Sequence, residues 1–325
     1  MAYQPATNMT TDAGKAHLAT VSYKRKALDT LKKMTWFLSG CEDDVLERRQ
    51  GMTVQWWRPT LPGANTTPSS EGTVGAGLTS ASTTVSATVS PYSDFYSISA
   101  LLLETDIANT ILYHTELLSY RGALSVDTIA RLEFDSPTAN DVDTLGATFT
   151  TGDIRLNNAL LNGIDARGGP KGAADRLLIM HPYAVYDLKA DNTAGGFIDI
   201  MKYANPQAFI NGAPLPNEVG RIDNTRIVQT TNVKTSGTAP NVKYWNYLIG
   251  KGAVGAVDLA GSGPTRLTDP SKQAFNIRTL QPGPNPADPE GNIGAFVSYR
   301  FVFVVKELDS TNRRCRKIKA DVSLV

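Results

Sequence analysis

Residues 51–98 constrain the fold of this chain more than any other segment, because the stretch between their two strand-like parts contains almost nothing that could form a core. Glu71 is the only charged residue between positions 61 and 93, and residues 65–82 are almost all Ser, Thr, Gly and Ala. Such a segment cannot bury enough apolar surface to offset the entropy lost on ordering. The flanking residues 52–60 (MTVQWWRPT) and 83–89 (TTVSATV) have a composition typical of strands. The pattern predicts a long two-stranded extension with a flexible tip.

A projecting hairpin of this kind has to be covered by something. An isolated two-stranded hairpin is at best marginally stable in water. Trp56 and Trp57 are adjacent, so their rings should lie on opposite faces of the strand. Bare strand edges beside exposed aromatic rings favour association. We therefore expect a neighbouring subunit to pack against this extension.

The composition of the 325 residues excludes several classes of protein. Lys plus Arg number 32 and Asp plus Glu number 31, so the chain lacks the basic excess of proteins that wrap nucleic acid. Hydrophobic residues make up 41% of the chain, which is enough for a buried core. No apolar run approaches the roughly 18 residues of a transmembrane helix, and residues 1–20 lack the pattern of a signal peptide. We expect a protein that is made in a cytoplasm and has no membrane partner.

Cysteine and histidine are too few to organise the chain. Cys41 and Cys315 cannot form a disulfide framework. They could form one bridge, but two reduced thiols are the simpler interpretation. The three histidines, His17, His114 and His181, argue against a multi-histidine metal site. We predict no metal and no cofactor.

Residues 1–50 are predicted to form an N-terminal arm. Within it, residues 21–34 (VSYKRKALDTLKKM) can form a short basic helix. The charged residues at the end of the arm are Glu42, Asp43, Asp44, Glu47, Arg48 and Arg49. These alternating blocks of charge are typical of a solvated face, and docking onto a neighbouring chain is the alternative.

The clearest helix spans about residues 106–134. Apolar and small residues recur along it at every third or fourth position, from Ile107 to Leu132. Thr105 is a suitable N-cap, and Ser136-Pro137 should end the helix. A helix of this length would span roughly 43 Å at 1.5 Å per residue, which exceeds the usual range in globular proteins. We predict that it serves as a structural spine.

The second half of the chain has the pattern of a compact α/β unit. Helices are predicted at residues 151–162 and from Pro182 to Asp191, and a loop rich in Pro and Gly at 281–292. The predicted strands are 176–180, 226–229, 244–249, 253–259, 295–307 and 317–322.

A glycine-rich turn gives the sharpest match to a chemical motif. Residues 250–255 (GKGAVG) follow a predicted strand and match the G-x-G-x-x-G turn of dinucleotide-binding proteins, with Asp269 near the expected acidic position. Such a site also needs a helix that points its N-terminus at the pyrophosphate, but glycines and a proline break the segment at 261–264. A strand–turn–strand with glycines at positive φ is the simpler interpretation. A nucleotide-dependent reductase that uses Gly250–Gly255 is the alternative from a different functional class.

No catalytic arrangement is recognisable elsewhere in the sequence. His181 precedes Pro182 at the end of a predicted strand, but no G-x-S-x-G nucleophile motif accompanies it. We interpret His181 as the residue that starts a helix, and His114 as a buried or interface polar group on the spine helix. No pair of carboxylates stands in a recognisable acid–base setting. We predict that the protein is not an enzyme and has no catalytic residues.

The densest basic run lies near the C-terminus. It comprises Arg313, Arg314, Arg316, Lys317 and Lys319. If the run forms a strand, Arg314 and Arg316 lie on one face and Lys317 and Lys319 on the other. A solvated edge or salt bridges between subunits would explain the run, and contact with packaged nucleic acid on the inside of a shell is the alternative.

Four phrases occur along the chain in an informative order. They are residues 23–33 (YKRKALDTLKK), 91–105 (PYSDFYSISALLLET), 176–191 (RLLIMHPYAVYDLKAD) and 248–257 (LIGKGAVGAV). In this order they resemble the major capsid proteins of tailed bacteriophages with the Hong Kong 97-type fold. Within that family they look most like the branch typified by the coliphage N-four capsid protein, and the resemblance covers about Tyr23 to Val325.

The resemblance implies an α+β subunit made of five segments. These are an N-terminal arm (1–50), an extended β-hairpin loop (51–96), a peripheral domain with the spine helix (97–150), an α/β axial domain (151–289) and C-terminal strands that return to the peripheral domain (290–325). The hairpin would lie over a neighbouring subunit. The residues expected at that interface are Glu42, Asp43, Asp44, Arg48, Arg49, Trp56, Trp57, Arg58 and Glu71.

The resemblance also implies a function. The protein would be a major capsid protein, a structural subunit that assembles with itself into the pentamers and hexamers of an icosahedral head. The head would enclose double-stranded DNA through weak, non-specific contacts, and the protein would be found in the virion after assembly in the bacterial cytoplasm. A separate scaffolding protein, a portal and a decoration protein are the other expected partners. No residue can be assigned to a Lys–Asn cross-link. An encapsulin-like nanocompartment shell protein is the alternative with the same fold.

Overall fold

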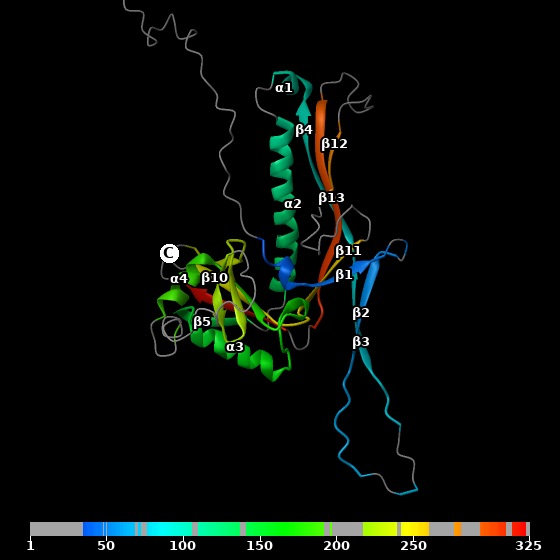
Figure 1. Cartoon of the computed structure of the whole chain (residues 1–325), viewed down its shortest axis with the longest axis vertical. Coiled ribbons are helices and arrows are strands. Elements are labelled where there is room, and N and C mark those ends of the chain that lie inside the picture. The colour runs from blue at the N-terminus through cyan, green and yellow to red at the C-terminus, as the bar shows by residue number, and fades with distance from the viewer. Residues whose placement is uncertain are drawn as a thin grey trace, which may run out of the picture.

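The computed structural model shows a subunit built from two larger β-sheets, a long helix and a projecting hairpin (Figure 1). This arrangement confirms the predicted α+β class. The structure describes residues 35–47, 49, 51–68, 71–72, 77–105, 110–136, 141–191, 196, 217–238, 242–259, 276–280, 293–309 and 314–322. The predicted basic helix at 21–34, the loop at 281–292, His17 and Asp269 lie outside the described residues.

The first sheet joins strands that are far apart in the sequence. It contains β1 (Glu42–Leu46), β11 (Val254–Leu259), β13 (Ile293–Glu307), β12 (Asn276–Leu280) and β4 (Ser90–Ser99). Strand β13 organises the sheet, because it pairs with β4, β11 and β12. Its alternate residues Val297, Tyr299, Phe301 and Phe303 are buried, as the period of two in the sequence predicts.

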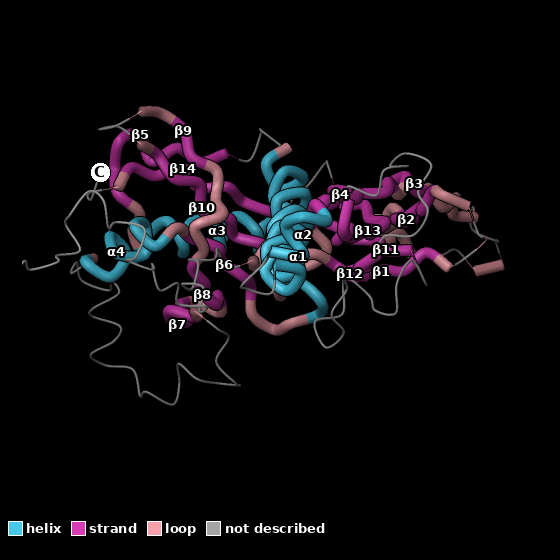
Figure 2. The backbone as a smooth tube through the Cα atoms, turned by 90° about the horizontal axis from the view of Figure 1, so that it is seen from above, coloured by secondary structure: helices cyan, strands magenta, loops and turns pink. Residues whose placement is uncertain are grey.

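Helix α2 (Thr110–Asp135) is the predicted spine and lies between the two larger sheets (Figure 2). Its buried residues recur at every fourth position, so one stripe faces the core: Leu118, Gly122, Val126, Ala130 and Phe134. The predicted N-cap is wrong. Thr105 is the last residue of a separate short helix, α1 (Ala100–Thr105), and its hydroxyl donates to the carbonyl of Leu101 at 2.7 Å. A hydroxyl that is satisfied within its own turn does not cap the next helix.

The second sheet forms the α/β part of the molecule. Its order is β5 (Asp141–Thr148), β14 (Cys315–Asp321), β10 (Lys243–Ile249), β6 (Arg176–Met180), β8 (Thr225–Gln229) and β7 (Glu218–Ile222), with β9 (Thr235–Ser236) paired to β10. All five residues of β6 are buried. Leu177 and Ile179 belong to the core shared with α2, whereas Leu178 and Met180 belong to the core on the opposite face. The strand is therefore covered on both faces.

Two helices begin where the sequence predicts. At the start of α3 (Thr151–Gly163), the carboxylate of Asp153 accepts a hydrogen bond from Thr150 N at 2.8 Å, which satisfies a backbone donor of the first turn. Helix α4 (Pro182–Ala190) follows His181, whose Nδ1 accepts a hydrogen bond from Tyr183 N at 3.2 Å. This contact confirms the interpretation of His181 as a residue that starts a helix. A short 3₁₀ turn, η3 (Pro170–Gly172), precedes β6, and another, η2 (Leu38–Gly40), precedes β1.

The two larger sheets exchange strands at a joint. Strand β10 lies in the seven-stranded sheet and runs through the turn at 250–253 into β11, which lies in the five-stranded sheet. Strand β13 lies in the five-stranded sheet, and β14 pairs with β10 in the other. The two C-terminal strands therefore lie in different sheets. The division of the chain into five segments stays a prediction.

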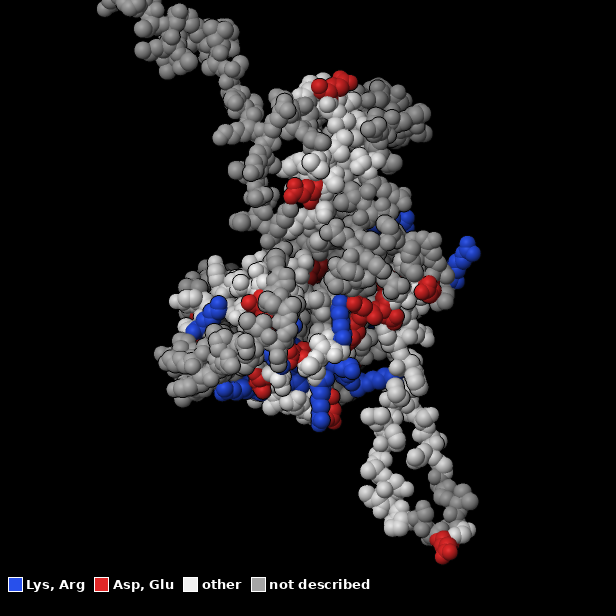
Figure 3. Space-filling model, in the orientation of Figure 1, with Lys and Arg blue, Asp and Glu red and all other residues white. Residues whose placement is uncertain are grey.

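The hairpin consists of β2 (Thr53–Pro59) and β3 (Ser82–Thr88). The two strands pair with each other in an antiparallel ladder and form a separate two-stranded sheet. From Pro59 to Thr84, every described residue is exposed. Figure 3 shows that the described part of the hairpin is free of charge between its root and its tip. These observations confirm the predicted two-stranded extension.

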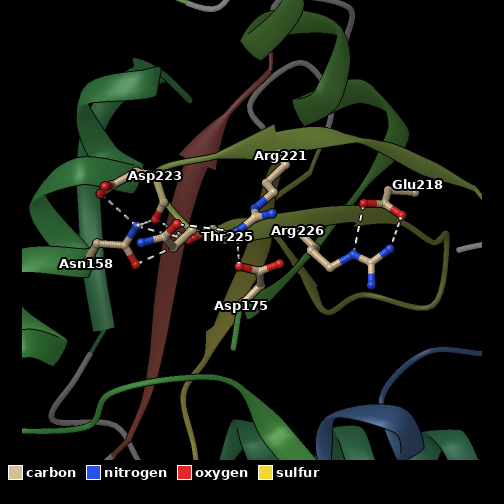
Figure 4. Close-up of polar contacts among 8 residues, drawn as sticks. Asn158, Asp175, Glu218, Arg221, Asp223, Thr225 and Arg226 are labelled. Carbon is tan, nitrogen blue, oxygen red and sulfur yellow. Dashed lines mark hydrogen bonds and ion pairs between the residues drawn. The ribbon is translucent and has the colours of Figure 1, made fainter. Parts of the chain in front are cut away.

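Polar contacts secure the β7–β8 hairpin against α3 (Figure 4). The side-chain amide of Asn158 donates to Asp223 Oδ2 and to Thr225 Oγ1, each at 3.0 Å. Asp223 has a φ of 47°, as expected in a tight turn between antiparallel strands. Arg226 Nη2 lies 2.8 Å from Glu218 Oε2 across the two strands. The edge of the seven-stranded sheet is therefore tied to the helix that covers it.

Candidate functional site: the projecting hairpin and its root

The two adjacent tryptophans of β2 have different environments, as their position in a strand predicts. Trp57 is 67% exposed, and it stands opposite Thr84 in the ladder. Trp56 is half-buried and packs against the hydrophobic cluster of Leu46, Val89, Val257 and Val302. A Cβ atom added to Gly255 would lie 3.0 Å from Trp56 Cζ2, so this glycine allows the ring to approach β11 closely. Trp56 anchors the root of the hairpin within its own subunit, and Trp57 is left open to a neighbour.

An ion pair lies beside this aromatic anchor. Arg58 pairs with Asp309, and Asp309 is only 3% exposed. The second oxygen of the carboxylate lies 3.1 Å from Arg314 Nε. The buried charge of Asp309 is thus compensated from two sides, which such a group requires. Arg58 is the outermost residue of β2 that is partly buried.

Two of the acidic residues predicted at the interface have partners within their own subunit. The carboxylate of Glu42 accepts hydrogen bonds from Gly252 N at 2.9 Å and from Lys171 N at 3.0 Å. Asp43 pairs with Lys171 Nζ at 2.7 Å. Burial raises the pKa of Asp43, and Lys171 opposes that shift. Glu42 and Asp43 therefore fasten β1 to the joint between the two larger sheets.

The other predicted interface residues are more open. Asp44 is exposed, and one of its carboxylate oxygens accepts a hydrogen bond from Val45 N at 2.8 Å. Arg49 is exposed with a φ of 67°, and Glu71 is exposed beyond the ladder. Arg48 lies outside the described residues. We use the term assembly surface for the exposed side chains Asp44, Arg49, Trp57 and Glu71.

The basic run forms a strand, but its side chains are not all available. Lys317 is 2% exposed and donates to the carbonyl of Asp135 at 2.9 Å. The ammonium groups of Lys317 and Lys319 lie 5.3 and 5.7 Å from the centre of the Trp245 ring. This position leaves Lys317 no exposed surface for contact with nucleic acid. Nothing in the basic run itself indicated this, because Trp245 comes from β10, which pairs with β14.

The remaining described members of the basic run are also only partly available at the surface. Arg316 is half-buried, and burial lowers its pKa. Arg314 is half-buried and engaged at the joint, and Arg313 lies outside the described residues. The neighbouring thiol, Cys315, is buried, as is Cys41, and burial raises the pKa of both. The two cysteines are free, in agreement with the simpler interpretation of the sequence.

The glycine-rich turn does not have the geometry of a dinucleotide site. It is followed by strand β11 rather than by a helix, so the segment directly after the turn offers no helix N-terminus to a pyrophosphate. The expectation that its glycines have positive φ holds only for Gly252, at 67°. Gly250 is required for another reason, since an added Cβ would lie 3.0 Å from the carbonyl of Arg314. Gly255 makes room for Trp56. Close packing at the joint explains the glycines.

One functional candidate was not found from the sequence. Asp127 of α2 is 1% exposed and accepts hydrogen bonds from Phe37 N and from Asn232 Nδ2, each at 2.7 Å. Burial raises its pKa from 3.8 to about 6. Asp127 therefore joins the end of the arm to the spine. The spacing of Asp127 in the sequence could have indicated that it is buried, because it lies three residues before Ala130 on the buried side of the helix.

The histidines and the acidic groups show no arrangement for chemistry. His114 Nδ1 lies 2.8 Å from the carbonyl of Thr110, and its ring packs edge-on against Tyr96. His181 stacks on Tyr244 with ring centres 4.1 Å apart. Among the described residues, no group of three His, Cys, Asp or Glu side chains could hold a metal ion.

No helix in the described part of the chain is long and apolar enough to span a bilayer.

Comparisons with known proteins give matches in structure but not in sequence. No protein-family model matches the chain, and no curated protein matches it either. A chain from the cyanophage Pam1 capsid has a TM-score of 0.70 at 12% identity, and the match covers 99% of this chain and 100% of that one. For the capsid of Ralstonia phage GP4, the TM-score is 0.68 at 12% identity, with 98% and 99% covered. For the capsid of cyanophage P-SCSP1u it is 0.64 at 14% identity, with 99% of each chain covered.

These matches extend over almost the whole of each chain, including the hairpin, the spine and both larger sheets. They agree with the fold that the four sequence phrases imply, while the particular branch of the family stays a prediction. The chain has the Hong Kong 97-type fold of the capsid subunits of tailed bacteriophages.

Proposed function

We propose that this chain is the major capsid protein of a tailed bacteriophage, a structural subunit that assembles with itself into the pentamers and hexamers of an icosahedral head around double-stranded DNA. The observation that carries the proposal is the hairpin. Every described residue from Pro59 to Thr84 is exposed, and Trp57 stands on its outer face without a neighbour of comparable size in the ladder. Such an element becomes stable when another copy supplies the missing face.

The fold supports the same function. Capsid chains from three different phages match this chain over nearly its full length. Contacts worth roughly 4–8 kcal/mol each correspond to millimolar to micromolar affinity, and they become strong when every subunit makes several of them. The assembly surface and the hairpin would provide such repeated contacts. The protein would then act as a shell component of the virion, with no catalytic activity.

The other partners follow from the same proposal. A separate scaffolding protein, a portal and a decoration protein would join the shell, and DNA would be held by weak contacts. In the basic run, Lys319 and Arg316 are half-buried, so any contact with DNA would use their remaining exposed surface. An encapsulin-like compartment is not favoured, because the similar structures named above are phage capsids. The reductase lacks support because the turn at 250–255 leads into a strand.

Electron microscopy of the purified protein tests this proposal. We would image the full chain by negative stain, alone and co-expressed with the neighbouring genes. The matched variant lacks residues 65–80, which leaves both strands intact because β3 begins at Ser82. We expect closed shells, or rings of five and six, from the full chain and a folded protein with few shells from the variant.

Two outcomes would count against the proposal or part of it. A full chain that stays monomeric in both conditions would overturn the capsid function. Normal-sized shells in full yield from the variant would refute the role of the hairpin in assembly. Circular dichroism of the variant checks that its two larger sheets and the spine remain folded.

A further inference from the structure

The hairpin is attached to the rest of the subunit by few contacts. No hydrogen-bonded ladder joins β2 or β3 to another sheet within the described part of the chain. The hydrophobic contacts of its root come from Val54 and Trp56, together with the buried residues Ala87 and Val89. Beyond these, Arg58 makes the last contact with the body through its ion pair with Asp309.

Asp309 connects the hairpin to the joint between the two larger sheets. It follows β13 shortly before β14 begins in the other sheet, and its carboxylate pairs with both Arg58 and Arg314. Arg314 Nη1 in turn donates to the carbonyl of Lys251 at 3.3 Å. Lys251 belongs to the turn between β10 and β11. One buried carboxylate therefore contacts the hairpin on one side and, through Arg314, both strand crossings on the other.

A small change at this root has a large effect at the tip. From Pro59 to Pro68, a fully extended chain at about 3.3 Å per residue would reach about 30 Å. A tilt of about 10° at the root would then move its outer end by about 5 Å, which is about the spacing between neighbouring strands. Val54, Trp56, Ala87 and Val89 hold the root in place, but these contacts lie close together and inward of Arg58, so they constrain the angle only weakly. A further contact, displaced outward along the strand, is needed to fix it.

We propose that the Arg58–Asp309 ion pair is the positioning contact that sets the inclination of the hairpin and links it to the joint between the two larger sheets. The effect on a shell rests on the proposed function, because the inclination decides how the hairpin meets the neighbouring copy. Arg58 is 37% exposed at its side chain and Asp309 only 3%, so the carboxylate is the fixed partner and the arginine the movable one.

A distance measurement on the unassembled protein tests the proposal without relying on shells. Spin labels at Leu61→Cys, on the hairpin, and Leu112→Cys, on α2, report the inclination by pulsed electron resonance. Both positions are exposed, whereas the native cysteines are buried. We expect a narrow distance distribution in the parent protein and a distribution at least twice as broad, or displaced, in Arg58→Ala. Asp309→Asn removes the charge from the other side and should broaden it as well.

Arg58→Lys is the matched control, because it keeps a cation at the same position and should restore a narrow distribution. Trp57→Ser changes the opposite face of the strand and should leave the distribution unchanged. Distributions in Arg58→Ala and Asp309→Asn that match the parent would overturn the proposal. Particle diameters of the same variants test the effect on shell assembly separately from the effect on the inclination of the hairpin. Broadened distances with unaltered shells would refute the link to assembly, and the absence of shells from every variant and the parent would refute the proposed function alone.

Discussion

Replacing Asp127 with Asn tests a stability effect that runs against the usual behaviour of carboxylates. Asp127 is 1% exposed and accepts hydrogen bonds from Phe37 N and Asn232 Nδ2, each at 2.7 Å. These bonds and the nearby charge of Arg131 lower its pKa, but burial outweighs them and raises it to about 6. The arm is therefore attached to the spine through a charged group that its surroundings do not fully compensate.

The magnitude follows from the pKa in the folded and unfolded states. The ordinary value is 3.8 and the folded value about 6, and a gap of about two pKa units is equivalent to about 3 kcal/mol. Below the unfolded pKa, both states are protonated and the full stability is present. As the pH rises toward 6, the unfolded chain releases the proton first, and the free energy of unfolding falls by up to about 1.4 kcal/mol per pH unit. Above pH 6, the fold is weaker by about 3 kcal/mol than in acid.

Urea unfolding of the unassembled protein between pH 4 and pH 7 measures this effect. Burial also raises the pKa of Asp43 and of Asp135, so the parent protein contains further contributions of the same sign. Subtracting the free energy of unfolding of Asp127→Asn removes the contributions of Asp43 and Asp135, because both proteins contain them. The amide of the variant has the same shape as the carboxyl group and does not titrate. The free energy of unfolding of the parent relative to the variant should rise by about 2.4 kcal/mol from pH 7 to pH 4, because pH 4 is still slightly above the unfolded pKa. A difference that stays flat across this range, or that falls in acid, would refute the reasoning.

Three further predictions concern close packing at a glycine, the two tryptophans of the hairpin and a buried arginine. Gly255→Ala should lower the free energy of unfolding by about 1–3 kcal/mol, because the new Cβ would lie 2.9 Å from the nearest side chain. The control is Gly63→Ala, whose new Cβ would meet nothing within 4 Å. Equal losses of stability for the two variants in urea unfolding would contradict the packing argument. Trp56→Ala should lower the melting temperature of the unassembled protein, whereas Trp57→Ala should leave it unchanged and reduce the yield of shells, a prediction that fails if Trp57→Ala melts early. Arg176→Met should cost at least about 2 kcal/mol, because it leaves the buried acceptors Asn158 Oδ1 and Ala166 O without the donors that now lie 2.9 and 2.8 Å away. Denaturation of the variant at the parent's urea midpoint would show that these bonds contribute nothing.

Local patterns in the sequence predicted most of the elements. The strands at 176–180 and 244–249 and the helix at 151–162 agree with the structure to within one residue at each end. Their signals are short-range: short apolar runs in the strands, apolar residues at helical spacing in the helix, and a proline after His181. The same holds for the opposite faces of Trp56 and Trp57, which depend only on the geometry of a single strand.

Pairings between distant segments were beyond the reach of such patterns. The sequence does not indicate that β10 and β11 lie in different sheets, since both are ordinary apolar strands on either side of a turn. The short helix α1 was also missed, and it contacts β13, a strand far away along the chain. Lys317 belonged to a basic run in the sequence, yet it is buried beneath Trp245 of β10. In each case, the deciding contact comes from a residue far away along the chain.

By itself, the sequence determined that residues 65–82 could not form a core and belong to a projecting extension, because that depends on composition alone. It also determined the spine helix and the strands, which follow from local periodicity. Only the tertiary structure decided which charges are exposed. Glu42, Asp43, Arg58 and Lys317 all looked like surface groups, but each has a partner within the subunit that the fold brings from more than a hundred residues away. Charge pairing in a folded protein depends on distance in space, which chain order does not encode locally.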